Sequence, residues 1–83
     1  MKITVEISMY PLSEDFIPPI KAVIEKLNSF ENMQMQTFAT ATTIIGEFEI
    51  VMEALKETLA WSYKQFGTAV FVTKLIPGYD PAT

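Results

Sequence analysis

The chain has 83 residues, ten acidic residues against six lysines, and a formal net charge of −4, and it contains no cysteine, histidine or arginine. Without cysteine and histidine it has no thiol nucleophile, imidazole base, disulfide or usual zinc site. Without arginine it lacks the bidentate cation that phosphate and nucleic-acid recognition normally uses. We therefore expect no enzyme, no metal or permanent cofactor, and no nucleic-acid partner.

The length predicts one domain over residues 1–83, with residues 78–83 as a polar C-terminal tail. A domain of this size has a marginal core, so we expect self-association as a homodimer or tetramer to add stability. The N-terminal residues form an alternating pattern instead of an apolar signal segment, and no apolar run is long enough to span a bilayer. These features predict a soluble, cytoplasmic protein without membrane insertion, although the absence of cysteine fits an oxidising compartment as well.

The first element is predicted to be a strand that ends near Tyr10. Its apolar residues Ile3, Val5, Ile7 and Met9 alternate with polar ones, a pattern typical of a strand with one face on a core. The opposite face carries Glu6, Ser8 and Tyr10.

A helix follows, because apolar residues recur at helical spacing at Phe16, Ile17, Ile20, Val23, Ile24 and Leu27. Ser13 is the expected N-cap, and Glu14 and Asp15 suit the positive end of the helix dipole. The helix is therefore predicted to begin near Glu14 or Asp15, with the prolines at positions 18 and 19 tolerated close to its start. The alternative is that Pro19 moves the start of the regular helix a few residues later.

The rest of the chain is predicted to form two strands, a second helix and a final strand. Alternation predicts a short strand over residues 33–38 and a third strand over residues 42–48. A second helix is predicted up to Gly67, with a core stripe of Val51, Met52, Leu55, Leu59 and Phe66. Trp61 lies off this stripe, which we interpret as a contact with a neighbouring subunit. A final strand is predicted over residues 68–76, ended by Pro77 and Gly78.

The order strand, helix, strand, strand, helix, strand predicts an α+β, ferredoxin-like βαββαβ fold. This fold has a four-stranded antiparallel sheet with both helices on one face. The other face has no helix to cover it, although alternation in the last strand places either Val70, Val72 and Ile76 or Ala69, Phe71 and Leu75 there. We expect a second copy of the chain to cover this apolar surface.

Glu6, Ser8 and Tyr10 would face the same uncovered side of the sheet. If a partner sheet closes over them, they need mutual hydrogen bonds, water or a ligand, because burying an unpaired polar group costs roughly 1–3 kcal/mol. The alternative is that this face stays hydrated, the ordinary state of an antiparallel sheet.

Two segments, "EISMYPLSEDFIPPI" and "TATTIIGEFEIVMEAL", resemble the YkoF-like thiamine/hydroxymethylpyrimidine-binding family, and the resemblance extends over nearly the whole chain. It implies a single-domain member that binds thiamine or its hydroxymethylpyrimidine moiety without transforming it, in thiamine transport or salvage. The family pairs ferredoxin-like domains, so an oligomer would have to supply the pairing here. An acidic chain without arginine suits thiamine better than thiamine diphosphate.

The resemblance implies a polar and aromatic pocket at or near an oligomer interface. Its candidate residues are Glu6, Ser8, Tyr10, Asp15, Phe38, Thr42 and Glu47. Ser8 would hydrogen-bond the pyrimidine, Tyr10 would stack on a ring, and Glu6 would supply charge.

Each candidate residue also has a plainer interpretation. Ser8 and Glu6 are compatible with an exposed strand surface, and Asp15 with compensation of the helix dipole. Phe38 is either a stacking ring or a subunit contact. Thr42 and Glu47 differ in parity, so a regular strand puts them on opposite faces.

Two other functions stay open. One is a ligand-independent structural or regulatory oligomer that uses the uncovered face of the sheet for self-association. The other is an enzyme in which Tyr10 works with Glu6 or Asp15 as an acid/base pair, which the fold permits but does not imply.

Overall fold

The computed structural model of the protein describes residues 1–81. The final two residues of the predicted C-terminal tail lie outside the described residues. The elements follow the predicted order: β1 (Lys2–Pro11), α1 (Ile17–Asn28), β2 (Met33–Thr37), β3 (Thr42–Glu47), α2 (Phe48–Phe66) and β4 (Ala69–Pro77).

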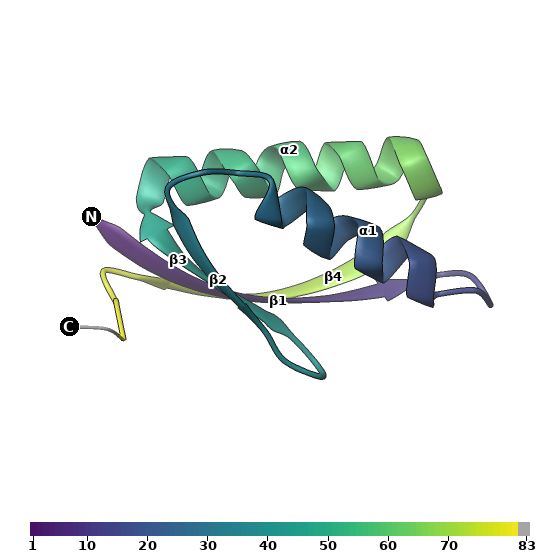
Figure 1. The fold of residues 1–83 in the computed structure, drawn as a ribbon, viewed down its shortest axis with the longest axis horizontal. Helices are drawn as coiled ribbons and strands as arrows, with labels where there is room; N and C mark the ends of the chain where they lie inside the picture. The colour runs from purple at the N-terminus through teal and green to yellow at the C-terminus, as the bar shows by residue number, and fades with distance from the viewer. Residues whose placement is uncertain (82–83) are drawn as a thin grey trace.

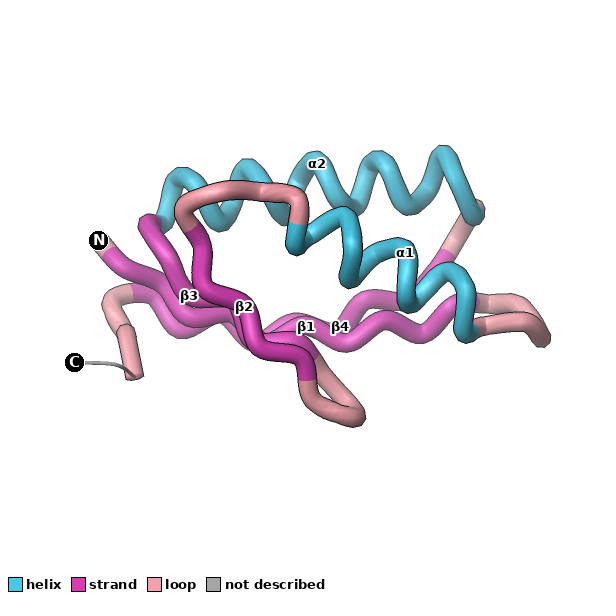
Figure 2. The backbone as a smooth tube through the Cα atoms, in the orientation of Figure 1, coloured by secondary structure: helices cyan, strands magenta, loops and turns pink. Residues whose placement is uncertain are grey.

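The four strands form one antiparallel sheet in the order β2-β3-β1-β4, with both helices on the same face (Figure 1). The tube view shows this two-layer arrangement, with α1 and α2 side by side above the strands (Figure 2). The ferredoxin-like α+β fold predicted from the alternating patterns is confirmed.

The hydrophobic core lies between the helices and the inner face of the sheet. The predicted alternation of β1 holds, because Ile3, Val5 and Ile7 are all at most 5% exposed. Val5 lies opposite Ile44 of β3, so the two central strands share this face. From the helices, Val23, Leu27, Val51 and Leu55 complete the buried cluster.

Helix α1 begins later than predicted. It begins at Ile17, with Phe16 as the N-cap residue and no side-chain cap. The hydroxyl of Ser13 donates instead to the carbonyl of Asp15 at 3.1 Å. In a helix that began at Glu14, Pro18 and Pro19 would be the fifth and sixth residues, where proline has no N–H to donate to the carbonyl four residues before it. A start at Ile17 places both prolines in the first turn, where those N–H groups have no partner within the helix.

The boundary between β3 and α2 also differs by one residue. Phe48 was expected to end the strand but is the first residue of α2. Its N–H donates to the carbonyl of Met1 at 2.9 Å, so the start of the helix is tied to the start of β1.

The buried stripe of α2 is more polar than predicted. Leu59 and Phe66 were expected in the core, yet both are at least 40% exposed. Thr58 and Ser62 are buried in their place. Helix α2 packs on both the sheet and α1, and the side of the helix that faces these two elements is buried. This side does not coincide with the most apolar residues of the helix.

Trp61, predicted to contact a neighbouring subunit, makes contacts within its own chain, and the subunit contact stays a prediction. The Trp61 side chain is partly buried against the core of its own chain. Its ring packs edge-on against Phe66 with centroids 6.0 Å apart. The Lys26 ammonium lies 5.7 Å from its centroid, a cation–π distance.

On the outer face of the sheet, Val70, Val72 and Ile76 lie opposite Tyr10, Ser8 and Thr4. They are therefore the set that no helix covers, and each is about half exposed. The described part of the C-terminal tail lies at the Thr4 end of this face, where the Thr4 hydroxyl donates to the carbonyl of Tyr79 at 2.8 Å.

Candidate ligand-binding cavity

A cavity of about 520 Å³ lies where β1, α1 and the loop between β2 and β3 meet. One wall is the C-terminal half of β1, and another is the inward side of α1, from Phe16 to Leu27. The loop of residues 38–41 and the strand ends beside it form the third wall. Phe71 of β4 also contributes to the lining.

The cavity exists because β1 is longer than its neighbour β3. The last pair between these strands is Ile7 with Thr42, whereas β1 continues alongside β4 as far as the pair of Pro11 with Ala69. Residues 8–11 of β1 therefore have a free edge on the β3 side. The β2–β3 loop leaves the sheet here and extends to the side away from the helices (Figure 1). Because no strand pairs with this edge and the loop turns away from the helices, the space between this edge and α1 stays open as the cavity.

Hydroxyl groups line the part of the cavity next to this edge. Thr42 is 5% exposed, and its Oγ1 lies 3.3 Å from Oγ1 of Thr37 across the β2–β3 pair. The Ser8 hydroxyl donates to the carbonyl of Thr40 at 2.8 Å. The threonine hydroxyls can donate to or accept from a polar heterocycle, whereas the Ser8 hydroxyl, which donates to Thr40, is left as an acceptor.

Three aromatic rings line the cavity and are also exposed, so they lie at its opening. They are Tyr10 from the end of β1, Phe16 from the start of α1 and Phe38 from the loop. Phe38 was expected inside the second strand, but β2 ends at Thr37 and the Phe38 N–H donates to the carbonyl of Ala41 in a tight turn. Exposed rings around an apolar space are suited to contact with a flat aromatic ligand.

The structure thus brings together four of the seven residues predicted for a site, namely Ser8, Tyr10, Phe38 and Thr42. Glu6 does not line this cavity. It forms an ion pair with Lys74 of β4 on the outer face, at 3.6 Å between Oε1 and Nζ. Asp15 lies in the turn before α1 and does not line the cavity either.

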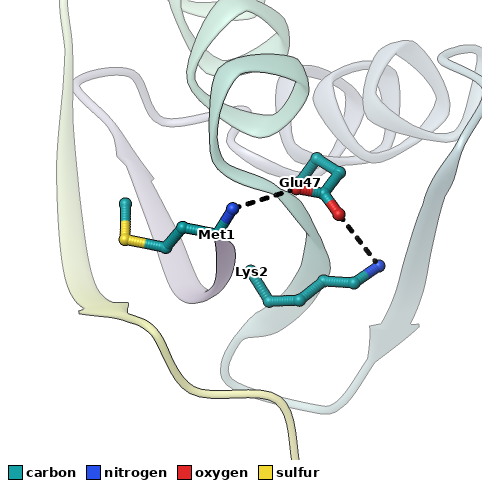
Figure 3. Close-up of polar contacts among 3 residues, drawn as sticks. All are labelled: Met1, Lys2 and Glu47. Atoms are coloured by element: carbon teal, nitrogen blue, oxygen red, sulfur yellow. Dashed lines mark hydrogen bonds and ion pairs between the residues drawn. The ribbon is translucent and has the colours of Figure 1, made fainter.

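Glu47 lies at the opposite end of β1 from the cavity. Its carboxylate is 3.3 Å from the N-terminal amine of Met1 and 3.7 Å from Nζ of Lys2 (Figure 3). Thr42 is opposite Ile7 on the inner face, whereas Glu47 is opposite Lys2 on the outer face. The prediction that a regular strand separates these two residues is confirmed.

Sequence reasoning did not assign the α1 side of the cavity to a site. Ile20 and Ile24 were predicted as core residues from their helical spacing, but they line the cavity with Met9 of β1. The useful signal was strand length, because the alternation of the first strand covers residues 2–10 whereas the predicted third strand covers the shorter range 42–48. When two neighbouring strands differ in length, the longer strand has an unpaired edge beyond the end of the shorter one.

None of the side chains that line this cavity in the described chain is charged. A second, smaller cavity of about 270 Å³ lies at the other end of the sheet and includes Lys2 and Asp80. Residues 1–81 contain no group of three or more acidic side chains arranged to hold a metal ion. No helix in this part of the chain is long and apolar enough to cross a membrane.

The comparison with family models decides the relationship. The model of the YKOF-related family matches residues 2–73, which hold the whole cavity lining. The chain belongs to the YKOF-related family. The family resemblance inferred from the β1–α1 and β3–α2 segments is thereby confirmed.

Solved structures similar to this YKOF-related protein include a candidate thiamine biosynthesis/salvage protein from Thermotoga maritima, 28% identical. The alignment has a TM-score of 0.84 and covers 99% of this chain and 87% of the other. A Streptococcus pneumoniae protein is 23% identical, with a TM-score of 0.76 and coverages of 95% and 89%. A hypothetical protein from Methanocaldococcus jannascii is 22% identical, with a TM-score of 0.79 and coverages of 95% and 82%. The latter two show the fold alone. No curated protein matches the chain significantly.

Proposed function

We propose that this YKOF-related protein binds thiamine or its hydroxymethylpyrimidine moiety without transforming it, in thiamine transport or salvage. The observation that carries the proposal is the cavity, because it gathers Ser8, Tyr10, Phe38 and Thr42 around one space. Family membership and the Thermotoga maritima neighbour, whose name refers to thiamine, support it.

The size and chemistry of the cavity suit the pyrimidine half of thiamine. Its volume of about 520 Å³ falls within the range of roughly 300–1,000 Å³ typical of small-molecule sites. The aminopyrimidine is neutral, flat and able both to donate and to accept hydrogen bonds. An uncharged apolar space with hydroxyls at one edge accommodates such a ring without leaving a buried charge unpaired. The exposed aromatic rings at the opening would then face the thiazolium cation.

Phosphorylated forms should bind less well than thiamine itself. A diphosphate is recognised best by arginine forks, lysines or helix N-termini. The chain has no arginine and carries a net charge of −4, and no lysine lines the described cavity. We therefore propose free thiamine or hydroxymethylpyrimidine as the ligand and a lower affinity for the diphosphate.

Isothermal titration of the purified protein with thiamine, thiamine diphosphate and hydroxymethylpyrimidine tests this proposal. Thr42→Val removes a hydroxyl from the cavity at nearly constant volume and is expected to weaken binding about tenfold, the loss of one ligand hydrogen bond. Thr58→Val is the matched control, because Thr58 is also buried but does not line the cavity. The Thr58→Val variant should bind thiamine with the same affinity as the unmodified protein.

Tighter binding of thiamine diphosphate than of thiamine would overturn the proposed preference. Absence of heat with all three compounds, from a folded protein, would overturn thiamine binding itself. Conversion of any of the three compounds would contradict a purely binding function.

A second proposed function is self-association through the outer face of the sheet, independent of any ligand. The specific observation is that Val70, Val72 and Ile76 of β4 are 47%, 52% and 44% exposed on a face that neither helix covers. Apolar residues arranged in a row along an edge strand are typical of a subunit interface. The proposed interface adjoins the cavity at one end, because Val70 and Val72 lie opposite Tyr10 and Ser8, which also line the cavity, whereas Ile76 lies at the far end of the strand.

A further inference from the structure

The loop of residues 38–41 is the least anchored wall of the cavity. All four of its residues line the space, and none of them belongs to the hydrophobic core of the described chain. Three of them are exposed. Packing therefore contributes little to the position of this wall, and its hydrogen bonds decide where it lies.

The backbone ladder cannot hold the loop against β1. Pairing between β1 and β3 ends at Ile7 with Thr42, the residue that directly follows the loop, so no loop residue pairs with β1. Inside the loop, the Phe38 N–H donates to the carbonyl of Ala41 at 2.8 Å, which fixes the shape of the turn but not its place. The hydroxyls of Thr37 and Thr42 pair only at its base.

One side chain of β1 reaches across the gap. The Ser8 hydroxyl donates to the carbonyl of Thr40 at 2.8 Å, and the two residues are 32 positions apart in the sequence. Ser8 is the first residue of β1 beyond its pairing with β3. Its side chain therefore connects β1 to the loop at the point where backbone pairing ends.

We infer that Ser8 is a positioning residue that holds the β2–β3 loop, and with it Phe38, in place as the outer wall of the cavity. Its hydroxyl hydrogen is committed to Thr40, so its main contribution to a ligand is made through the loop. The consequence for binding rests on the proposed function, whereas the effect on the loop does not. Loss of the hydroxyl should free the loop in the protein without ligand and speed the release of thiamine.

The test compares Ser8→Ala with Ser8→Thr, which keeps the hydroxyl. Ser13→Ala is the matched control, because Ser13 also donates to an exposed backbone carbonyl but does not line the cavity. Backbone ¹⁵N relaxation of residues 39–41 is measured without ligand, and thiamine binding and dissociation are measured on the same samples. In Ser8→Ala we expect loop order parameters to fall from about 0.85 to below about 0.6. We expect thiamine to dissociate roughly three- to tenfold faster.

Recovery of both values in Ser8→Thr, with Ser13→Ala unchanged, would support the inference. Unchanged loop order in Ser8→Ala would overturn it. Weaker thiamine binding in Ser8→Ala with an unchanged loop would also overturn it and make Ser8 a direct ligand contact. A loosened loop in Ser8→Ala, in a protein whose unmodified form binds no thiamine, would support the role of Ser8 in positioning the loop and overturn the proposed function.

Discussion

At the scale of single residues, hydroxyl groups have three different roles in this protein. Ser8 bridges β1 to a loop, and Thr42 pairs with Thr37 beside the cavity. Thr58 and Ser62 of α2 are buried, yet neither side-chain oxygen has a hydrogen-bond partner among the described residues. An unpaired buried hydroxyl loses its hydration without compensation, so these two residues are expected to lower stability.

Thr58→Val tests this expectation, because it removes the hydroxyl and keeps the shape of the side chain. We expect the free energy of unfolding to rise by roughly 1 kcal/mol, which corresponds to a melting temperature about 4–8 °C higher in a domain of this size. Thr73→Val, at an exposed position of β4, is the control and should shift stability by less than about 0.5 kcal/mol. A destabilised Thr58→Val would mean that the hydroxyl has a partner, such as a buried water molecule.

Site residues were predictable from the sequence to different degrees. Ser8 and Tyr10 stood out because they are polar and aromatic at the end of an otherwise regular strand, and both line the cavity. Glu6 shares their face but lies opposite Lys74, a cross-strand neighbour that no local pattern reveals. The alternating pattern shows which residues share a face of the sheet but not which residues of other strands they contact. It therefore could not predict that Glu6 pairs with a lysine while Ser8 and Tyr10 line the cavity.

At the scale of elements, the start of α1 shows how one local rule overrides another. The sequence before the helix has the composition of a capped start, with Ser13 followed by two acids. The prolines at positions 18 and 19 cannot donate to the carbonyls four residues before them, so the helix begins at Ile17, where both prolines lie in its first turn. The first turn is preorganised by fixed proline φ angles instead.

Ser13→Ala distinguishes these two descriptions of the helix start. A true N-cap serine would lose about 0.5–2 kcal/mol of stability on replacement by alanine. Because the Ser13 hydroxyl only closes an exposed turn on Asp15, we expect a loss below about 0.5 kcal/mol. Chemical denaturation of both proteins measures the difference. A loss above about 1 kcal/mol would restore Ser13 as the cap.

At the scale of the whole molecule, the order of elements was fully readable from hydrophobic periodicity, because the period changes from 2 to 3.6 and back in a regular sequence. The cavity was not readable, since it depends on β1 continuing past β3 and on the path of a loop. The uncovered apolar row on β4 was predicted as one of two alternating sets, and the register with β1 selects Val70, Val72 and Ile76.

Ile76→Asp tests self-association through this face. Ile76 lies at the opposite end of β4 from the cavity, so ligand binding should be preserved. We expect the mass in solution to fall to that of a monomer, because a charge would be buried without a partner in the interface. Leu75→Asp is the matched control, with a similar exposure of 49% against 44% but on the other face. An oligomer unchanged by Ile76→Asp, or a protein that is already monomeric, would contradict this interface.

We propose that the cavity between α1, β1 and the β2–β3 loop holds the pyrimidine of thiamine. The most direct test is an NMR titration of the ¹⁵N-labelled protein with hydroxymethylpyrimidine, followed by thiamine. We predict saturable amide shifts concentrated in residues 7–11, 37–42 and the cavity side of α1, with none around Glu47. Saturable shifts confined to the outer face around Glu6 and Lys74, or no shifts at millimolar ligand, would contradict the claim.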